Sequence, residues 1–243
     1  MSDYAKGLEG VIANESALSN VEGLEGRLSY LGYSIDELVE NCSFEETTYL
    51  LHFGKLPNTS ELADFEKSLR TNREIPQGVI DFLKSAPKDA NPMDVLRTGV
   101  SMLGLFDKRA GIGEPDQDAN REVAISLCAQ TSVIVAYYHR ARQGLDLPPV
   151  RDDLSEAGHF LYLITGDEPS EAATKTLDIA YILHADHGMN ASTFSARVTV
   201  ATLSDFYSAM TSAVGTLKGP LHGGANEGVI KMLQEIGSLD KVD

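Results

Sequence analysis

The sequence predicts a mainly α fold with a short β-hairpin close to the N-terminus. Apolar residues recur at helical spacing over most of the 243 residues, and helix-capping sequences precede several of these stretches. No internal repeat and no regular alternation of strands and helices is present, which argues against an α/β fold. Residues 7–33 are the exception, because glycines are dense there and residues 27–31 roughly alternate in polarity. We expect the hairpin, or an extended arm, in this segment.

Serine followed three residues later by glutamate marks the start of the first two helices. Ser34 and Glu37 can form a capping box, in which the serine side chain accepts a hydrogen bond from the glutamate amide and the glutamate side chain reaches back. Ser43 and Glu46 repeat this pattern. Gly54 suits the left-handed conformation that ends many helices, so we expect the second helix to end there.

The remainder of the chain is predicted to consist of helices separated by polar or proline-containing loops. Pro92 suits the first turn of a helix, and residues 107–118 form a polar loop. Residues 120–143 carry apolar side chains over more than one face, which is typical of a helix buried inside the subunit or against a partner subunit. The predicted helices cover residues 60–71, 77–84, 93–106, 120–143, 154–163, 171–187, 192–202, 204–217 and 226–236.

Charge and cysteine content limit the possible functions. The net charge of −16 argues against binding to nucleic acid or to an anionic membrane surface, because both need clustered Lys and Arg. The longest apolar runs, such as residues 132–138, are too short to span a bilayer, and the first residues lack the apolar core of a signal peptide. Cys42 and Cys128 match no metal-binding spacing and are interpreted as reduced thiols, so we expect a cytoplasmic, acidic protein.

Two histidines lie close together at the end of the helix predicted over residues 171–187. His184 and His187 are three residues apart, so both imidazoles are expected on one side of this helix near its C-terminus. That end of a helix favours a protonated imidazole, which can bind a carboxylate or another anionic oxygen. An equally open interpretation is that the two rings only bond to the free carbonyl groups of the last turn.

A third histidine, His222, lies in a glycine-rich bend over residues 219–227 that leads into a predicted helix. Glycines allow backbone conformations and close approaches that other residues forbid. The positive end of the following helix disfavours protonation of a nearby imidazole. A neutral imidazole can donate a hydrogen bond to a developing enolate oxygen. A turn histidine exposed to solvent is the alternative interpretation.

The same segments contain side chains that could hold a metal ion, namely those of His184, Asp186, His187 and His222. However, the spacing of the first two histidines is not the i, i+4 spacing of a zinc protease, and no glutamate lies between them. We therefore expect no metal site. Nucleophile-elbow, P-loop and dinucleotide-binding motifs are also absent from the sequence.

The sequence resembles the citrate synthase family nearly from end to end. The two longest matching stretches are HADHGMNASTF, over residues 184–194, and LKGPLHGGANE, over residues 217–227. Within the first of these, the order His-Gly-Met-Asn looks most like the archaeal, particularly the halophilic, branch of the family. Shorter matching stretches cover residues 6–11, 26–33 and 91–98.

This resemblance implies a multi-helical enzyme that works as a homodimer and condenses acetyl-CoA with oxaloacetate. The citryl-CoA formed is then hydrolysed to citrate and CoA, so acetyl-CoA is a substrate and no cofactor is expected. Carried over by motif, His222 would stabilise the enolate of acetyl-CoA, and His187 would bind oxaloacetate. Asn190 would shape the oxaloacetate pocket, and His184 would support it. The dimer interface would come largely from helices near residues 93–106, 120–143 and 193–217.

The resemblance also implies two domains, of which the second is truncated. Residues 1–218 would form the large helical domain, and residues 219–243 would form a hinge and the first helix of the small domain. In the family the aspartate base, a second catalytic histidine and the arginines that hold oxaloacetate lie beyond the matching region. We therefore expect a fragment that does not turn over by itself. Three alternatives stay open here: a 2-methylcitrate synthase, a non-catalytic helical dimerisation module and a helical metal hydrolase.

Overall fold

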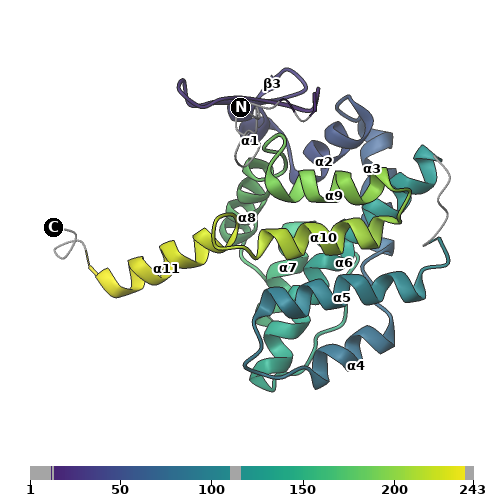
Figure 1. The fold of residues 1–243 in the computed structure, drawn as a ribbon, viewed down its shortest axis with the longest axis vertical. Coiled ribbons are helices and arrows are strands. Elements are labelled where there is room, and N and C mark those ends of the chain that lie inside the picture. Colours follow the sequence, from purple (N-terminus) through teal and green to yellow (C-terminus); the bar gives the residue numbers. More distant parts are fainter. Residues whose placement is uncertain (1–11, 13, 110–115, 239–243) are drawn as a thin grey trace, which may run out of the picture.

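The computed structural model describes residues 12, 14–109 and 116–238, and it confirms the mainly α class (Figure 1). Within these residues lie a three-stranded antiparallel sheet and eleven helices. The strands are β1 (Ser19–Glu22), β2 (Arg27–Tyr30) and β3 (Tyr33–Ser34), in that spatial order. The helices are α1 (Ile35–Asn41), α2 (Phe44–Phe53), α3 (Thr59–Thr71), α4 (Gln77–Ser85), α5 (Pro92–Phe106), α6 (Gln117–Gln143), α7 (Glu156–Thr165), α8 (Glu171–Leu183), α9 (Ala191–Ala201), α10 (Phe206–Leu217) and α11 (Gly224–Ile236).

The predicted β-hairpin is present, and it continues into a third short strand. Strands β2 and β3 are joined by Leu31 and Gly32, which have φ angles of 49° and 92°. Two consecutive left-handed residues form the tight turn that matches the twist of antiparallel strands. The part of the predicted segment that covers residues 7–11 and 13 lies outside the described residues.

Both predicted capping boxes are confirmed. The Ser34 hydroxyl accepts a hydrogen bond from the Glu37 amide at 3.2 Å, and the Glu37 carboxylate accepts one from the Ser34 amide at 3.2 Å. Ser43 and Glu46 form the same pair of bonds at the start of α2. Gly54 ends that helix with a φ of 77°. These features depend on neighbouring residues only, which explains why the sequence reveals them.

Four helices begin two or three residues away from their predicted starts; α11 begins at residue 224 instead of 226 without a side-chain cap, and the other three begin at a side-chain cap. Asp116 accepts hydrogen bonds from two amides of the first turn of α6, so α6 starts at residue 117 instead of 120. Ser155 caps α7, and Asp205 caps α10 in the same manner. Caps of this kind fix the start of a helix because they satisfy amides that have no partner within it.

Helix α6 forms the centre of the main hydrophobic core. Its side chains Leu127, Val133 and Ile134 are buried in contact with residues from α4, α5, α7 and α10. Helix α5 approaches α6 at Gly99, where a β-carbon would lie 3.0 Å from the Ile134 side chain. The wide apolar surface predicted for this helix is therefore buried inside the chain, which is one of the two alternatives that the sequence left open.

A buried ion pair joins the segment after α3 to α7. The Arg73 guanidinium, 1% exposed, donates two hydrogen bonds to Glu156 Oε1, at 2.9 Å and 2.5 Å, and one to the Leu154 carbonyl at 2.9 Å. The Glu156 amide in turn donates to the buried carboxylate of Glu45 at 2.7 Å, which ties α2 to the same cluster. Since neither charge reaches solvent, each depends on its partner.

His159 on α7 is fully buried close to this cluster. Neither of its ring nitrogens has a hydrogen-bond partner within the part of the chain that the structure describes. Burial, and to a lesser degree the positive charge of Arg73, lower the pKa of His159 to about 3. The ring is therefore neutral near pH 7 and occupies the core as an uncharged side chain.

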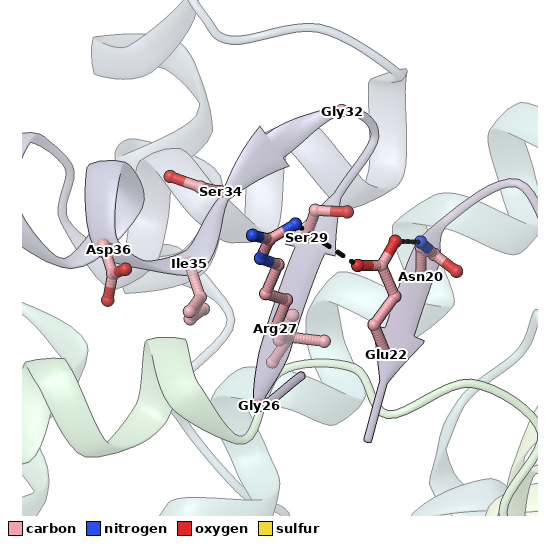
Figure 2. A pocket seen from close by; sticks show the side chains of 10 residues that line it. Asn20, Glu22, Gly26, Arg27, Ser29, Gly32, Ser34, Ile35 and Asp36 are labelled. Atoms are coloured by element: carbon pink, nitrogen blue, oxygen red, sulfur yellow. Dashed lines mark hydrogen bonds and ion pairs between the residues drawn. The ribbon is translucent and has the colours of Figure 1, made fainter. Parts of the chain in front are cut away.

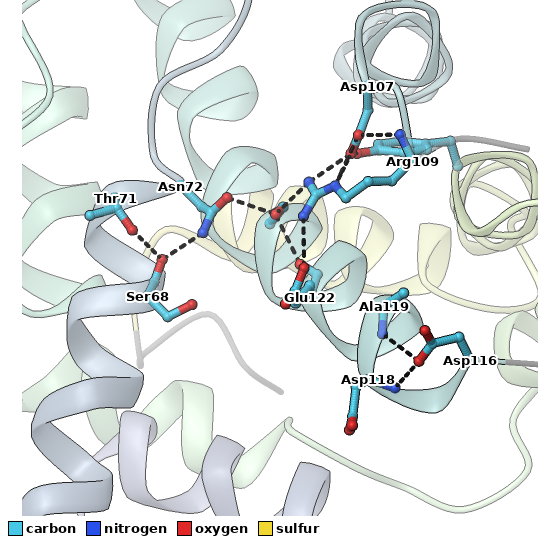
Figure 3. Close-up of polar contacts among 11 residues, drawn as sticks. Ser68, Thr71, Asn72, Asp107, Arg109, Asp116, Asp118, Ala119 and Glu122 are labelled. Atoms are coloured by element: carbon cyan, nitrogen blue, oxygen red, sulfur yellow. Dashed lines mark hydrogen bonds and ion pairs between the residues drawn. The ribbon is translucent and has the colours of Figure 1, made fainter. Parts of the chain in front are cut away.

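A second polar network lies at the C-terminal end of α5 (Figure 3). The Asp107 carboxylate accepts hydrogen bonds from Arg109 at 2.7–3.0 Å and from the Tyr207 hydroxyl at 2.5 Å. Desolvation by itself would raise the pKa of Asp107, but these hydrogen-bond donors lower it to about 2. Arg109 also donates to Ser126 on α6, so the network connects α5, α6 and α10. Of the loop predicted over residues 107–118, residues 110–115 lie outside the described part of the chain.

Helix α10 leads toward the glycine-rich bend, and α11 extends away from the helical body beyond it (Figure 1). Helix α10 packs against α9 on one side and α5 on the other. The Lys218 ammonium group, directly after α10, pairs with Asp94 on α5 at 2.6 Å and so fixes the start of the bend. Whether a domain boundary lies between residues 218 and 219 stays a prediction. None of the helices described here is long and apolar enough to cross a membrane.

Candidate active site

Helix α8 ends earlier than predicted, and this changes the relation between the two neighbouring histidines. The predicted helix runs to residue 187, whereas α8 ends at Leu183 with His184 as its C-cap. A contact from the N-terminal sheet lies at this end of the helix: the Tyr30 hydroxyl donates to the Ile182 carbonyl at 2.9 Å. His187 lies in the turn beyond the helix, so the prediction that both imidazoles share one helix face is wrong.

The rings of His184 and His187 have different surroundings, although both residues are exposed. The Nδ1 atom of His184 lies 2.7 Å from the Ala180 carbonyl, to which it donates a hydrogen bond. This contact ties the His184 ring to α8 and matches the helix-capping interpretation. The His187 ring is exposed and makes no side-chain hydrogen bond to another described residue.

The side chain of Asn190 has a structural role as a helix cap. Its side-chain oxygen accepts a hydrogen bond from the Thr193 amide at 2.9 Å, which caps the start of α9. Asn190 therefore orients α9 relative to the turn that carries His187. A direct contact of Asn190 with a substrate stays a prediction.

His222 lies in a tightly packed bend between α10 and α11. Its amide donates to the Gly219 carbonyl at 2.9 Å, and the Gly224 amide donates to the same carbonyl at 3.1 Å. A β-carbon at Gly223 would lie 2.7 Å from the Leu217 carbonyl oxygen, and one at Gly224 would lie 2.7 Å from the Lys218 carbonyl oxygen. Glycine is required at both positions because the bend packs against its own backbone.

The two long sequence motifs meet in space through one hydrogen bond. His222 Nε2 lies 2.8 Å from the hydroxyl of Ser192, in the first turn of α9, and both residues are half-buried. Ser192 follows Asn190 by two residues and therefore belongs to the same motif as His187. The sequence did not single out Ser192, because nothing local to it shows which side chain it contacts.

Replacing Gly224 with alanine is expected to disturb the His222 bend. The added methyl group would meet two backbone carbonyl oxygens at 2.7 Å and 2.8 Å, and neither can move without shifting the bend. We expect a loss of about 1–3 kcal/mol in the free energy of unfolding and a shifted His222 ring resonance. Urea denaturation and NMR of the histidine rings would measure these effects.

Gly228→Ala provides the matched control for Gly224→Ala. Gly228 lies within α11, and a β-carbon there would meet nothing within 4 Å. Since alanine is the better helix former, this variant is expected to gain about 0.5–1 kcal/mol. Equal effects of the two substitutions would show that the bend is not crowded in the way that the structure indicates.

The described residues do not support a metal centre. No group of three or more His, Cys, Asp or Glu side chains among them is arranged to hold a metal ion. The Asp186 carboxylate, which the sequence offered as a ligand, accepts hydrogen bonds from the Ser19 hydroxyl and from the Gly188 amide. These contacts give Asp186 a structural role in the turn.

Comparison with known proteins agrees with the sequence motifs. A family model described as citrate synthase, C-terminal domain, matches residues 7–243. A citrate synthase of Deinococcus radiodurans is 50% identical over 243 residues, which cover 100% of this chain and 64% of the relative. A 2-methylcitrate synthase of Shewanella oneidensis is 43% identical over 240 residues, which cover 97% of this chain and 63% of the relative.

The fold of this chain also matches the folds of solved structures. Citrate synthase of Thermoplasma acidophilum, in a ternary complex with carboxymethyl coenzyme A and oxaloacetate, matches with a TM-score of 0.92 and 30% identity. The match covers 98% of this chain and 62% of that structure, so the chain spans just under two thirds of the length of these relatives. The family model and the identity along the whole chain together show that the protein belongs to the citrate synthase family.

Proposed function

We propose that this chain carries the oxaloacetate-binding histidine and the enolate-stabilising histidine of a citrate synthase. His187 takes the first role and His222 the second, while His184 and Asn190 hold the oxaloacetate pocket in shape. The observation that carries the proposal is the hydrogen bond between Ser192 and His222, because it joins the two motifs at one place. The ligands named for the Thermoplasma acidophilum relative support oxaloacetate and an acyl-CoA as substrates.

The Ser192 contact also suggests how His222 would act. A neutral imidazole carries one proton, and when the Ser192 hydroxyl donates to Nε2 that proton resides on Nδ1. Nδ1–H is then available to donate to the thioester oxygen as negative charge develops on it. A donor placed before the charge appears stabilises the transition state more than the ground state.

We also propose that the 243-residue chain does not complete the reaction by itself. Removing a proton from the methyl group of a thioester requires a base, and a carboxylate is the expected one. Within the described residues, the hydrogen bonds and ion pairs place no carboxylate in contact with His222. Release of CoA thiol from acetyl-CoA by the purified chain, dependent on oxaloacetate, would refute this proposal.

Removing the His187 ring tests the substrate assignment. In calorimetric titration of the chain with oxaloacetate, His187→Ala is expected to weaken binding about tenfold or more, because a bond between an imidazole and a carboxylate is charge-assisted. His139→Ala, which removes an exposed ring on α6, is the control and is expected to bind as the wild type does. Unchanged affinity in His187→Ala would contradict the assignment.

The second acyl substrate to consider is propionyl-CoA, which a 2-methylcitrate synthase uses. The 43% identity to the 2-methylcitrate synthase of Shewanella oneidensis supports propionyl-CoA as an alternative acyl substrate. Because the two reactions share oxaloacetate, the oxaloacetate titration does not separate them. Competition between acetyl-CoA and propionyl-CoA in the whole enzyme would do so.

We further propose a cytoplasmic homodimer that supplies citrate to the tricarboxylic acid cycle. Exposed apolar side chains on α5 and α9 support self-association, namely Leu105, Phe106, Phe194 and Val198. Helix α6, which we also predicted to contribute, uses most of its apolar side chains inside the chain, so its share of such an interface would be small. The reduced state of Cys42 and Cys128 is compatible with the cytoplasm.

A further inference from the structure

Side chains from the N-terminal sheet reach the turn that carries His187. Tyr30, at the end of β2, is fully buried among Leu38, Leu50 and Ile182. Its hydroxyl donates to the Ile182 carbonyl at 2.9 Å and accepts from the Asp186 amide at 3.3 Å. One phenol group thus contacts the last turn of α8 and the residue immediately before His187.

The neighbouring strand β1 contacts the same turn. The Ser19 hydroxyl donates to Asp186 Oδ1, and the same oxygen accepts from the Gly188 amide at 2.8 Å. The backbone of Asp186 is therefore held by Tyr30, and its carboxylate is held by Ser19. Gly188, with a φ of 67°, makes the sharp change of direction that this arrangement requires. His187 lies between two residues whose positions are both fixed, while its own ring stays exposed.

The geometry of the sheet explains why Ser19 and Tyr30 act together. They are directly paired across β1 and β2, so their side chains point to the same face of the sheet. The opposite face carries Asn20, Glu22, Arg27 and Ser29, which line an open hollow of about 350 Å³ (Figure 2). On that face the polar groups bond to each other, as Asn20 does to Glu22 at 2.9 Å. Among the described residues, the side-chain hydrogen bonds from the sheet to the end of α8 and the His187 turn come from Ser19 and Tyr30.

The turn after Tyr30 contains a backbone conformation that few side chains adopt. Leu31 has a φ of 49°, and its amide donates to the Leu18 carbonyl at 2.9 Å. Its side chain packs against the cluster that contains Tyr30 and Ile182. Strain of this kind persists where the surrounding contacts determine the conformation, and it often accompanies a functional requirement. Here the strained turn ends β2 at the residue whose hydroxyl contacts α8.

We propose that Tyr30 and Ser19 are positioning residues for His187, through which the N-terminal sheet holds the turn over residues 184–190 in its oxaloacetate-binding conformation. The part that concerns oxaloacetate rests on the proposed function, whereas the positioning of the turn rests on the contacts alone. The sheet therefore acts on the substrate site without touching the substrate.

Amide hydrogen exchange and histidine-ring NMR of the 243-residue chain test the positioning directly. Tyr30→Phe keeps the ring but removes the hydroxyl, and it is expected to speed exchange of the Asp186 amide about tenfold and to shift the His187 ring resonance. Ser19→Ala is expected to speed exchange of the Gly188 amide severalfold, and Ser19→Thr is expected to restore slow exchange. Amides in the middle of α8 should keep the wild-type rates.

Tyr33→Phe is the matched control. Tyr33 pairs with Tyr30 across the turn, but its hydroxyl makes no hydrogen bond within the described residues. This variant is expected to leave both the exchange rates and the His187 resonance unchanged. Wild-type exchange and an unshifted His187 resonance in Tyr30→Phe and Ser19→Ala would overturn the positioning role. If Tyr30→Phe does not fold, Ser19→Ala and Ser19→Thr supply the same comparison.

Oxaloacetate titration separates this inference from the proposed function. If the wild type binds oxaloacetate, we expect Tyr30→Phe to weaken binding about tenfold while Tyr33→Phe binds normally. Variants that alter the turn but bind oxaloacetate as tightly as the wild type would overturn the role in substrate positioning. If the wild type does not bind oxaloacetate, the oxaloacetate role fails for this chain by itself, while altered exchange in Tyr30→Phe and Ser19→Ala would still support the contact between sheet and turn.

Discussion

Replacing Arg73 with methionine is expected to lower the free energy of unfolding by about 3–5 kcal/mol. The guanidinium is 1% exposed and makes hydrogen bonds to Glu156 and to the Leu154 carbonyl. Methionine fills much of the same space, so the loss arises mainly from leaving the Glu156 carboxylate buried without a partner. Urea denaturation at pH 7 would measure the change, and an unaltered dependence on urea concentration would show that both proteins unfold in the same way.

Arg70→Met is the matched control for this prediction. Arg70 lies three residues earlier and pairs with Glu66 at 3.0 Å, but both side chains are about 30% exposed, at 31% and 28%. Solvent screens such a pair, so we expect a change within about 0.5 kcal/mol. A loss below about 1 kcal/mol in Arg73→Met, or equal losses in both variants, would contradict the importance of the buried pair.

Acidification is expected to destabilise the chain partly through His159, and His159→Met should remove that part. In the folded chain the pKa of His159 is about 3, well below the ordinary value near 6.5. Between these values the unfolded chain binds a proton that the folded chain does not, so stability rises with pH across this window. A single such group contributes up to about 1.4 kcal/mol per pH unit.

The measurement is the difference in the free energy of unfolding between the wild type and His159→Met at several pH values from 7.5 down to about 4.5. Other groups whose pKa values are shifted, such as Glu45 and Asp107, are present in both proteins and largely cancel. Near pH 7.5 the His159→Met variant loses no hydrogen bond, because neither ring nitrogen of His159 has a partner within the described residues. His139→Met leaves the buried ring of His159 in place, so its free energy of unfolding should depend on pH as that of the wild type does. A difference that does not vary with pH would contradict the prediction.

The features that the sequence revealed correctly depend on residues close together in the chain. The capping boxes that start with Ser34 and Ser43 and the left-handed Gly54 each involve no more than a few consecutive residues. The histidine segments 184–187 and 219–227 were recognisable because the first holds two histidines three residues apart and the second places His222 among glycines. The helical class followed from the spacing of apolar residues over long stretches.

The features that the sequence did not reveal depend on contacts between distant residues. Helix α8 ends at residue 183, where Tyr30, about 150 positions earlier, bonds to its last turn. The partner of His222 is Ser192, and the partner of Arg73 is Glu156, 83 positions later. No periodicity or spacing identifies such pairs in a single sequence. The same holds for His159, whose burial depends on the packing of several helices.

The crowding at Gly223 and Gly224 has a mechanical consequence. At both glycines a β-carbon would lie 2.7 Å from a carbonyl oxygen of residue 217 or 218, so the bend packs closely against the end of α10. His222 lies in this bend, two residues before the start of α11. A tilt of α11 that carried the bend with it would change the distance between His222 Nε2 and the Ser192 hydroxyl, which is 2.8 Å. Such a tilt would release the imidazole from its serine partner.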